Sequence, residues 1–145
     1  MKVSEIMTRE VELAHPSETI THAAKLMASL DAGALPVADG DRLVGMITDR
    51  DIAIRGVGQG LGPNASVGDV MTREVMYCYD DQDLDEITEN MGEIQVRRLP
   101  VLNRGKRLVG IVALGDIAFE QGATNGAGEA LSRISEPRGR HSQSV

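Results

Sequence analysis

An internal repeat constrains this chain more than any other feature of its sequence. Residues 3–11, VSEIMTREV, return as residues 67–75, VGDVMTREV. Three shorter motifs return in the same order: LPV at 35–37 and 99–101, LVG at 43–45 and 108–110, and DIA at 51–53 and 116–118. A repeat of this period predicts two copies of one folding unit. It also predicts two versions of any site, so that differences between the copies carry information about function.

The repeat sets the expected domain boundaries. We expect repeat 1 over residues 1–60, a linker over 61–66, repeat 2 over 67–122 and a flexible C-terminal tail over 123–145. The segment GQGLGPN at 58–64 is rich in helix-breaking residues and separates the copies. A unit of about 60 residues buries too little surface to be stable alone. The two copies are therefore expected to share one core and to fold together.

Apolar periodicity and turn residues predict the same order of elements in both copies, a helical lead-in followed by strand, helix, strand, strand and helix. In repeat 1 the expected elements are a lead-in at 3–7, strands at 11–14, 34–38 and 43–47, and helices from Ser17 to before Gly33 and from Thr48 to about 57. In repeat 2 they are strands at 75–79, 99–102 and 108–112 and helices at 83–94 and 116–121. This β-α-β-β-α order predicts an α+β fold, in which two small mixed sheets pack face to face with the helices outside.

Composition excludes several functional classes. The net charge of −7 and the calculated pI of about 4.9 argue against a nucleic-acid partner, which needs a basic face to neutralise its phosphates. Tyr77, Tyr79 and Phe119 are the three aromatic residues, too few for base-stacking platforms. No apolar run approaches the roughly 20 residues that span a bilayer, and the N-terminus lacks the apolar core of a signal peptide. The single cysteine, Cys78, allows no internal disulfide. We therefore expect a cytoplasmic protein with no membrane partner.

The sharpest local signal is the sequence from Thr48 to Asp51, TDRD, where an apolar strand ends and a helix is expected to begin. One interpretation is structural, because Thr48 and Asp51 can form a short capping box. The other is functional, because a helix N-terminus suits a phosphate and a carboxylate placed there can accept both hydroxyls of a ribose. The residues alone leave both interpretations open. No Ser/His/Asp arrangement, glycine-rich phosphate loop or metal-ligand cluster in the sequence indicates an enzyme.

The repeated motifs, taken in their order along the chain, resemble those of a known family. The order V-x-[ED]-[IV]-M-T, then L-P-V, then L-V-G-[MI]-[IV]-x-x-x-D-I, present twice, is similar to a tandem CBS-domain pair, or Bateman module. The resemblance covers residues 1 to about 122 and is strongest to stand-alone bacterial CBS-pair proteins. It implies two repeats related by pseudo-twofold symmetry, two clefts between them and a regulatory role without catalysis. It also implies an adenosine compound as ligand, which is AMP, ADP, ATP or S-adenosylmethionine, with no cofactor required.

By the same resemblance, each cleft would combine residues of both copies. In the first cleft Thr48 and Asp51 would bind ribose and phosphate, with Arg50 and Arg55 as nearby cations. The residues that complete the two clefts would be Ala34, Tyr77, Tyr79 and Val96 in the first, and Asp116, Arg97, Arg98, His15 and Pro16 in the second. The copies differ because Ala113 stands where the first copy has Thr48. The first cleft therefore has the better ribose site, whereas the second, with its arginines, has the better phosphate site.

The favoured hypothesis is a non-enzymatic sensor, in which an adenosine nucleotide biases the packing of two repeats or two chains. Its output would pass through a homodimer or through a separate effector protein. The alternative is a ligand-free structural or protein-interaction dimer. A weaker alternative is a metal- or redox-responsive protein that uses Cys78 with His15 and His22, although their spacing lacks a zinc signature. Cys78 itself is expected to be a buried strand residue rather than a reactive thiol.

Overall fold

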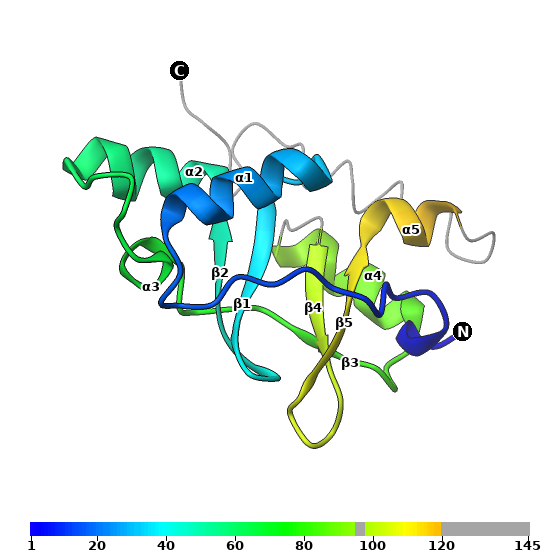
Figure 1. Ribbon diagram of the computed structural model, residues 1–145. Helices are drawn as coiled ribbons and strands as arrows, with labels where there is room; N and C mark the ends of the chain where they lie inside the picture. Colours follow the sequence, from blue (N-terminus) through cyan, green and yellow to red (C-terminus); the bar gives the residue numbers. More distant parts are fainter. Residues whose placement is uncertain (95–97, 120–145) are drawn as a thin grey trace. The chain divides into compact units, whose positions relative to one another are not determined.

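The computed structural model describes residues 1–94 and 98–119 and divides the chain into two compact units (Figure 1). The first-repeat unit comprises Glu12–Val75, and the second-repeat unit comprises Met1–Val11 together with Met76–Val145. Each unit thus contains the body of one repeat and the lead-in of the other. The predicted C-terminal tail lies outside the described residues.

The first-repeat unit is built on an antiparallel hairpin of two strands, β1 and β2, which contact helix α1 through β1. In this hairpin Ala34 pairs with Thr48, and the turn contains Gly40, whose φ of +65° favours glycine. The elements of the unit are α1 (Ile20–Leu30), β1 (Ala34–Asp39), β2 (Arg42–Thr48), α2 (Asp49–Asp51), the π-helix η2 (Ile52–Gly56), the 3-10 helix η3 (Val57–Gln59) and α3 (Val67–Val70).

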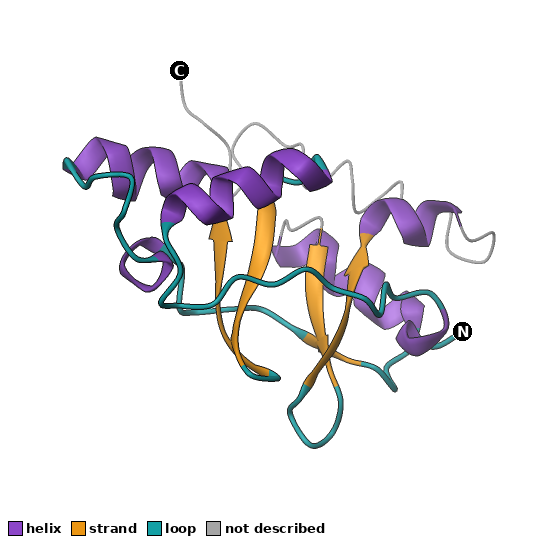
Figure 2. Cartoon of the chain, viewed as in Figure 1, coloured by secondary structure: helices purple, strands orange, loops and turns teal. Residues whose placement is uncertain are grey.

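The second-repeat unit contains a mixed sheet of three strands in the order β3-β4-β5. Strand β3 runs parallel to β4, and β4 pairs antiparallel with β5, with Arg98 opposite Ala113. The elements of the unit are the 3-10 helix η1 (Val3–Glu5), β3 (Cys78–Tyr79), α4 (Leu84–Ile94), β4 (Arg98–Leu102), β5 (Leu108–Ala113) and α5 (Leu114–Phe119). The predicted α+β fold with small sheets and helices is confirmed (Figure 2).

The two lead-ins are held by matching backbone contacts. Thr72 exchanges two backbone hydrogen bonds of 2.9 and 2.8 Å with β2, and Thr8 exchanges two of 2.8 and 3.0 Å with β5. Both contacts lie beside a glycine. A Cβ at Gly45 would be 2.8 Å from the carbonyl oxygen of Thr72, and a Cβ at Gly110 would be 2.8 Å from that of Thr8. The repeated L-V-G motif therefore leaves room for the repeated M-T motif of the opposite copy.

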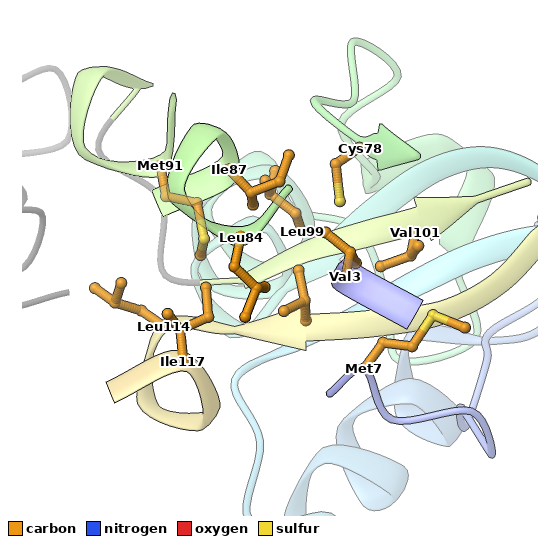
Figure 3. Close-up of a cluster of buried hydrophobic side chains, with 11 residues drawn as sticks. Val3, Met7, Cys78, Leu84, Ile87, Met91, Leu99, Val101, Leu114 and Ile117 are labelled. Atoms are coloured by element: carbon orange, nitrogen blue, oxygen red, sulfur yellow. The ribbon is translucent and has the colours of Figure 1, made fainter. Parts of the chain in front are cut away.

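Each unit has its own cluster of buried apolar side chains, and each cluster joins a lead-in to a repeat body. In the second-repeat unit, Val3 and Met7 pack with side chains of β4, β5, α4 and α5 (Figure 3). In the first-repeat unit, Val67, Val70 and Met71 pack with α1, β1 and β2. The core that the copies were expected to share thus takes the form of two clusters, each with residues from both repeats.

The linker contacts the N-terminus of α1. The first N–H groups of a helix have no partner within it, and here the carbonyls of Pro63 and Ala65 accept hydrogen bonds from Thr21 N and Ile20 N at 3.3 and 2.9 Å. The hydroxyl of Thr19 accepts a further bond from His22 N at 3.1 Å. The helix predicted from Ser17 therefore begins at Ile20, because Thr19 is the residue that caps it.

Two predicted strands are shorter in the structure than the sequence suggested. Of the strand predicted at 11–14 only Ala14 pairs, as an isolated bridge with Val37, and of the one at 75–79 only Cys78–Tyr79 forms β3. Beyond Ala14, the backbone N–H of His15 donates to the Glu18 carboxylate at 2.6 Å, which turns the chain towards α1 and ends the pairing. The other four predicted strands lie within one residue of β1, β2, β4 and β5.

The predicted helix after Thr48 is helical over the expected range, but only its first turn is an α-helix. Three α-helical residues lead into the π-helix η2 and then into η3, which ends at Gln59. Short π-helical segments often occur at functional sites. The last predicted helix begins at Leu114, two residues before its expected start, and the described part of α5 ends at Phe119. None of the helices within residues 1–94 and 98–119 combines the length and the apolarity that a membrane crossing requires.

Candidate functional site

The junction of β2 and α2 holds the main candidate residues of the first copy. The hydroxyl of Thr48 accepts a hydrogen bond from Asp51 N at 3.0 Å, and the Asp51 carboxylate accepts one from Thr48 N at 3.0 Å. The capping box that the sequence suggested is therefore present. The Asp51 side chain is only 12% exposed, although it carries a formal charge. The structural interpretation of this motif is confirmed, and the functional one stays a prediction.

Two further residues approach the Asp51 carboxylate. The hydroxyl of Thr72 lies 3.5 Å from both carboxylate oxygens, and Nε of Arg55 lies 4.0 Å from Oδ1. Arg55 also donates from Nη1 to the carbonyl oxygen of Met71 at 3.2 Å. The sequence contained a signal for Thr72, since it belongs to the repeated M-T motif, but nothing in the spacing indicated that it faces Asp51.

The hairpin brings Ala34 to the same junction. Ala34 pairs with Thr48 and is half-buried. The preceding residue, Gly33, accepts a backbone hydrogen bond from Asp49 at 2.9 Å, and a Cβ at Gly33 would lie 3.0 Å from the Asp49 carboxylate. Of the predicted first-cleft residues, Thr48, Asp51 and Ala34 are thus gathered in the first-repeat unit.

The corresponding junction of the second copy lacks these contacts. Ala113, opposite Arg98, has no hydroxyl to cap α5. Asp116 and Arg98 are exposed, and the Asp116 side chain has no hydrogen bond or ion pair to another residue in the part of the chain that the structure describes. The other predicted residues of this region, Val96 and Arg97, lie outside the described residues. The second copy therefore presents an exposed carboxylate, whereas that of Asp51 in the first copy is mostly covered.

Tyr77 and Tyr79 form an aromatic cluster in the second-repeat unit. Their ring centroids are 5.6 Å apart in an edge-to-face arrangement, and the guanidinium of Arg104 lies 4.1 Å from the centroid of Tyr79. Arg104 also donates two hydrogen bonds of 2.8 Å to the Asp81 carboxylate. These bonds lower the pKa of Asp81 and raise that of Arg104. Arg104 therefore contacts both the Tyr79 ring and the Asp81 carboxylate, an arrangement that the sequence did not indicate.

His15 and Pro16 lie in the loop before α1. The His15 ring accepts a hydrogen bond at Nδ1 from Ser17 N at 3.1 Å, and its Nε2 lies 3.4 Å from the Asp39 carboxylate. The Pro16 carbonyl accepts a bond from Gly68 N at 2.9 Å. Both residues thus have local structural partners within the first-repeat unit. The predicted clefts combine residues of the two units, and they stay a prediction.

Cys78 is 2% exposed, as expected of a buried strand residue. Burial, with a smaller effect from the Asp80 charge, raises the pKa of its thiol to about 12. A thiol with such a pKa is almost entirely protonated at neutral pH and is a poor nucleophile or metal ligand. Within residues 1–94 and 98–119, no three His, Cys, Asp or Glu side chains gather closely enough to hold a metal ion.

Comparison with known proteins identifies the repeats. The family model of the CBS domain matches residues 3–57 and again residues 67–122. The CBS domain-containing protein YhcV of Bacillus subtilis is 41% identical over 133 residues, which cover 92% of this chain and 94% of that protein. Hypoxic response protein 1 of Mycobacterium tuberculosis is 45% identical over 116 residues, which cover 79% of this chain and 80% of that protein.

Solved structures of CBS-domain proteins have the same fold. The crystal structure of Hypoxic Response Protein I with two coordinated zinc ions superposes with a TM-score of 0.75 and 43% identity, covering 83% of this chain and 98% of that one. The CBS domain pair of MJ0100 in complex with 5′-methylthioadenosine and S-adenosylmethionine superposes with a TM-score of 0.71 and 30% identity, covering 82% of this chain and 98% of that one. CBSX2 in complex with AMP superposes with a TM-score of 0.72 and 26% identity, covering 86% of this chain and 96% of that one.

Proposed function

Because the chain belongs to the CBS domain family, we propose that it is a non-enzymatic regulatory module that binds an adenosine nucleotide between its repeats. The candidate ligands are AMP, ADP, ATP and S-adenosylmethionine. Regulation requires only that the ligand bind two packing states of the protein with different affinities. The proposal needs no bound cofactor.

The geometry at the start of α2 carries the proposal. Thr48 and Asp51 place a hydroxyl and a mostly covered carboxylate side by side, each within 3.0 Å of a backbone N–H of the other residue. A carboxylate can accept both hydroxyls of a ribose, and its two oxygens offer about four acceptor positions, of which the cap uses one. Ala34 provides a small apolar neighbour on the adjacent strand. This set of groups suits a nucleoside better than it suits a metal or a peptide.

The ligands of related structures support the chemical class. The MJ0100 pair contains 5′-methylthioadenosine and S-adenosylmethionine and CBSX2 contains AMP, and all three share an adenosine moiety. Recognition common to these ligands must act on adenine and ribose. We therefore expect Asp51 in the first copy and Asp116 in the second to determine whether a nucleoside binds, and Arg98 to favour a phosphate.

Calorimetric titration of the full chain with AMP, ADP, ATP and S-adenosylmethionine tests the proposal. We expect heat of binding from at least one ligand and a marked loss of affinity at one site in Asp51→Ala. The matched control is Asp85→Ala, which removes an exposed carboxylate of α4 in the second-repeat unit. If none of the four compounds binds, the chain is instead a ligand-free interaction module, and the proposal is wrong.

We further propose that the module acts as a homodimer, which would transmit ligand binding to an effector protein. Three apolar side chains of the first-repeat unit favour association, because Leu30, Ile54 and Val57 are 42%, 46% and 71% exposed. Sedimentation equilibrium should therefore give twice the mass of the chain. A monomer at all concentrations would contradict the dimer without contradicting nucleotide binding.

A further inference from the structure

We propose that Arg55 and Thr72 are positioning residues that hold the Asp51 carboxylate for its ligand, and that they link this ligand to the lead-in of the second repeat, residues 67–72. The inference rests on the proposed function, since it concerns the same carboxylate. It adds the route by which occupancy of the first copy reaches another part of the chain.

Arg55 bridges the carboxylate and the lead-in. Its Nε lies 4.0 Å from Oδ1 of Asp51, one helical turn earlier, while its Nη1 donates to the Met71 carbonyl oxygen at 3.2 Å. The guanidinium is therefore already engaged on two sides, although it is 52% exposed. Arg50 differs, since its exposed side chain has no hydrogen bond or ion pair to any described residue. We therefore assign Arg55 to positioning and leave phosphate contact to Arg50.

Thr72 supplies the second contact. Its hydroxyl lies 3.5 Å from both oxygens of the Asp51 carboxylate, a long and therefore weak hydrogen bond. With the Thr48 N–H on Oδ2 and Arg55 near Oδ1, three groups fix the orientation of the carboxylate. Because two of these contacts are long, the carboxylate keeps acceptor capacity for the hydroxyls of a ribose. It is oriented without being saturated.

The lead-in at 67–72 is well placed to respond to a ligand bound at Asp51. It is tied to β2 by the two backbone hydrogen bonds of Thr72, and Gly45 brings the two backbones into close approach. Arg73, which directly follows the lead-in, donates to the carbonyl oxygen of Gly68 within it at 3.1 Å. If the docked lead-in improves ligand binding, the ligand must by reciprocity stabilise the docked lead-in.

The second copy provides an internal comparison. Thr8 is the repeat equivalent of Thr72, and Asp116 is the equivalent of Asp51. Both residues are exposed, and within the described parts of the chain no hydrogen bond joins them. The geometry therefore predicts that ligand binding is linked to the lead-in at Asp51 in the first copy but not at Asp116 in the second.

Titration with AMP and with adenosine tests the positioning role. We expect Thr72→Val and Arg55→Gln to weaken both ligands at the first site by roughly three- to tenfold, the effect of losing one ordinary hydrogen bond. Thr72→Ser, which keeps the hydroxyl, should restore binding, and Thr8→Val should change nothing. If Arg55→Gln weakens AMP but leaves adenosine unchanged, Arg55 contacts the phosphate and the inference is wrong.

Hydrogen exchange of the backbone amides at 67–72 tests the linkage. AMP should slow this exchange in the unchanged protein and in Thr8→Val, but much less in Thr72→Val. AMP binding of normal affinity without any change at 67–72 would overturn the inference and leave the proposed function intact. Failure of the unchanged protein to bind AMP and adenosine would overturn the inference, and failure to bind ADP, ATP and S-adenosylmethionine as well would overturn the proposed function.

Discussion

At the residue scale, the repeated glycines explain why the two motifs recur together. A Cβ at Gly45 would meet the Met71 sulfur at 2.7 Å and the Thr72 carbonyl oxygen at 2.8 Å, and backbone atoms cannot move aside cheaply. We expect Gly45→Ala to destabilise the protein by about 1–3 kcal/mol, as overpacking of a core does. Gly62→Ala is the matched control, because a Cβ there has no neighbour within 4 Å. Urea unfolding gives the free energy of unfolding of both variants, and equal values would contradict the role of Gly45 in this close approach.

Cys78 offers a second residue-scale prediction, which concerns pH. Because burial raises the pKa of the thiol from 9.0 to about 12, the folded protein should hold almost no thiolate at pH 8. Alkylation by iodoacetamide should be roughly a thousandfold slower in the native state than in urea, since each pKa unit changes the thiolate fraction about tenfold. Stability should be unaffected by this group below pH 9 and should fall as the pH rises from 9.0 towards 12.

A control separates the two causes of this pKa shift. Desolvation exceeds the Asp80 charge as its cause, so Asp80→Asn should raise the native alkylation rate only slightly. A native rate equal to that in urea would show that the thiol is accessible and would contradict its burial.

At the element scale, the two copies differ in how their last helix begins. Thr48 caps α2, whereas Ala113 offers α5 no side-chain acceptor. Ala113→Thr should therefore create a capping box with Asp116 and stabilise the protein by about 0.5–1 kcal/mol. The converse change, Thr48→Ala, should cost a similar amount. Thermal unfolding of both variants checks the pair, and a destabilising Ala113→Thr would mean that the strand end cannot accept the larger side chain.

The elements also show what could be predicted from the sequence. The hairpin strands were predictable because their apolar runs end at turn residues such as Gly40. The capping box was predictable because Thr48 and Asp51 have the residue types and the spacing that it requires. The strand predicted at 11–14 was too long, because pairing beyond Ala14 is prevented by the bend at His15, whose backbone N–H donates to the Glu18 carboxylate. The contact of Thr72 with Asp51 and that of Arg55 with the Met71 carbonyl could not be predicted, because they depend on which repeat body receives each lead-in.

At the scale of the whole molecule, the exchange of lead-ins makes each compact unit a product of both repeats. Val3 is fully buried in the second-repeat unit and Val67 in the first-repeat unit, although the two occupy equivalent positions in the repeat. A ligand that affects one lead-in therefore acts on the body of the opposite repeat. This arrangement gives a duplicated chain a physical reason to fold and respond as one protein, because neither repeat completes its own core.

The same exchange predicts crossed effects of equivalent mutations. Truncating a buried valine to alanine should cost about 1–3 kcal/mol from lost apolar contact and the cavity that remains. Val3→Ala should loosen the second-repeat unit and raise hydrogen exchange in α4, whereas Val67→Ala should loosen the first-repeat unit and raise exchange in α1. Hydrogen exchange followed by mass spectrometry resolves the two helices in one experiment. If each mutation instead affected the helix of its own repeat, the lead-ins would pack within their own copies, and the linkage proposed between Asp51 and residues 67–72 would lose its structural basis.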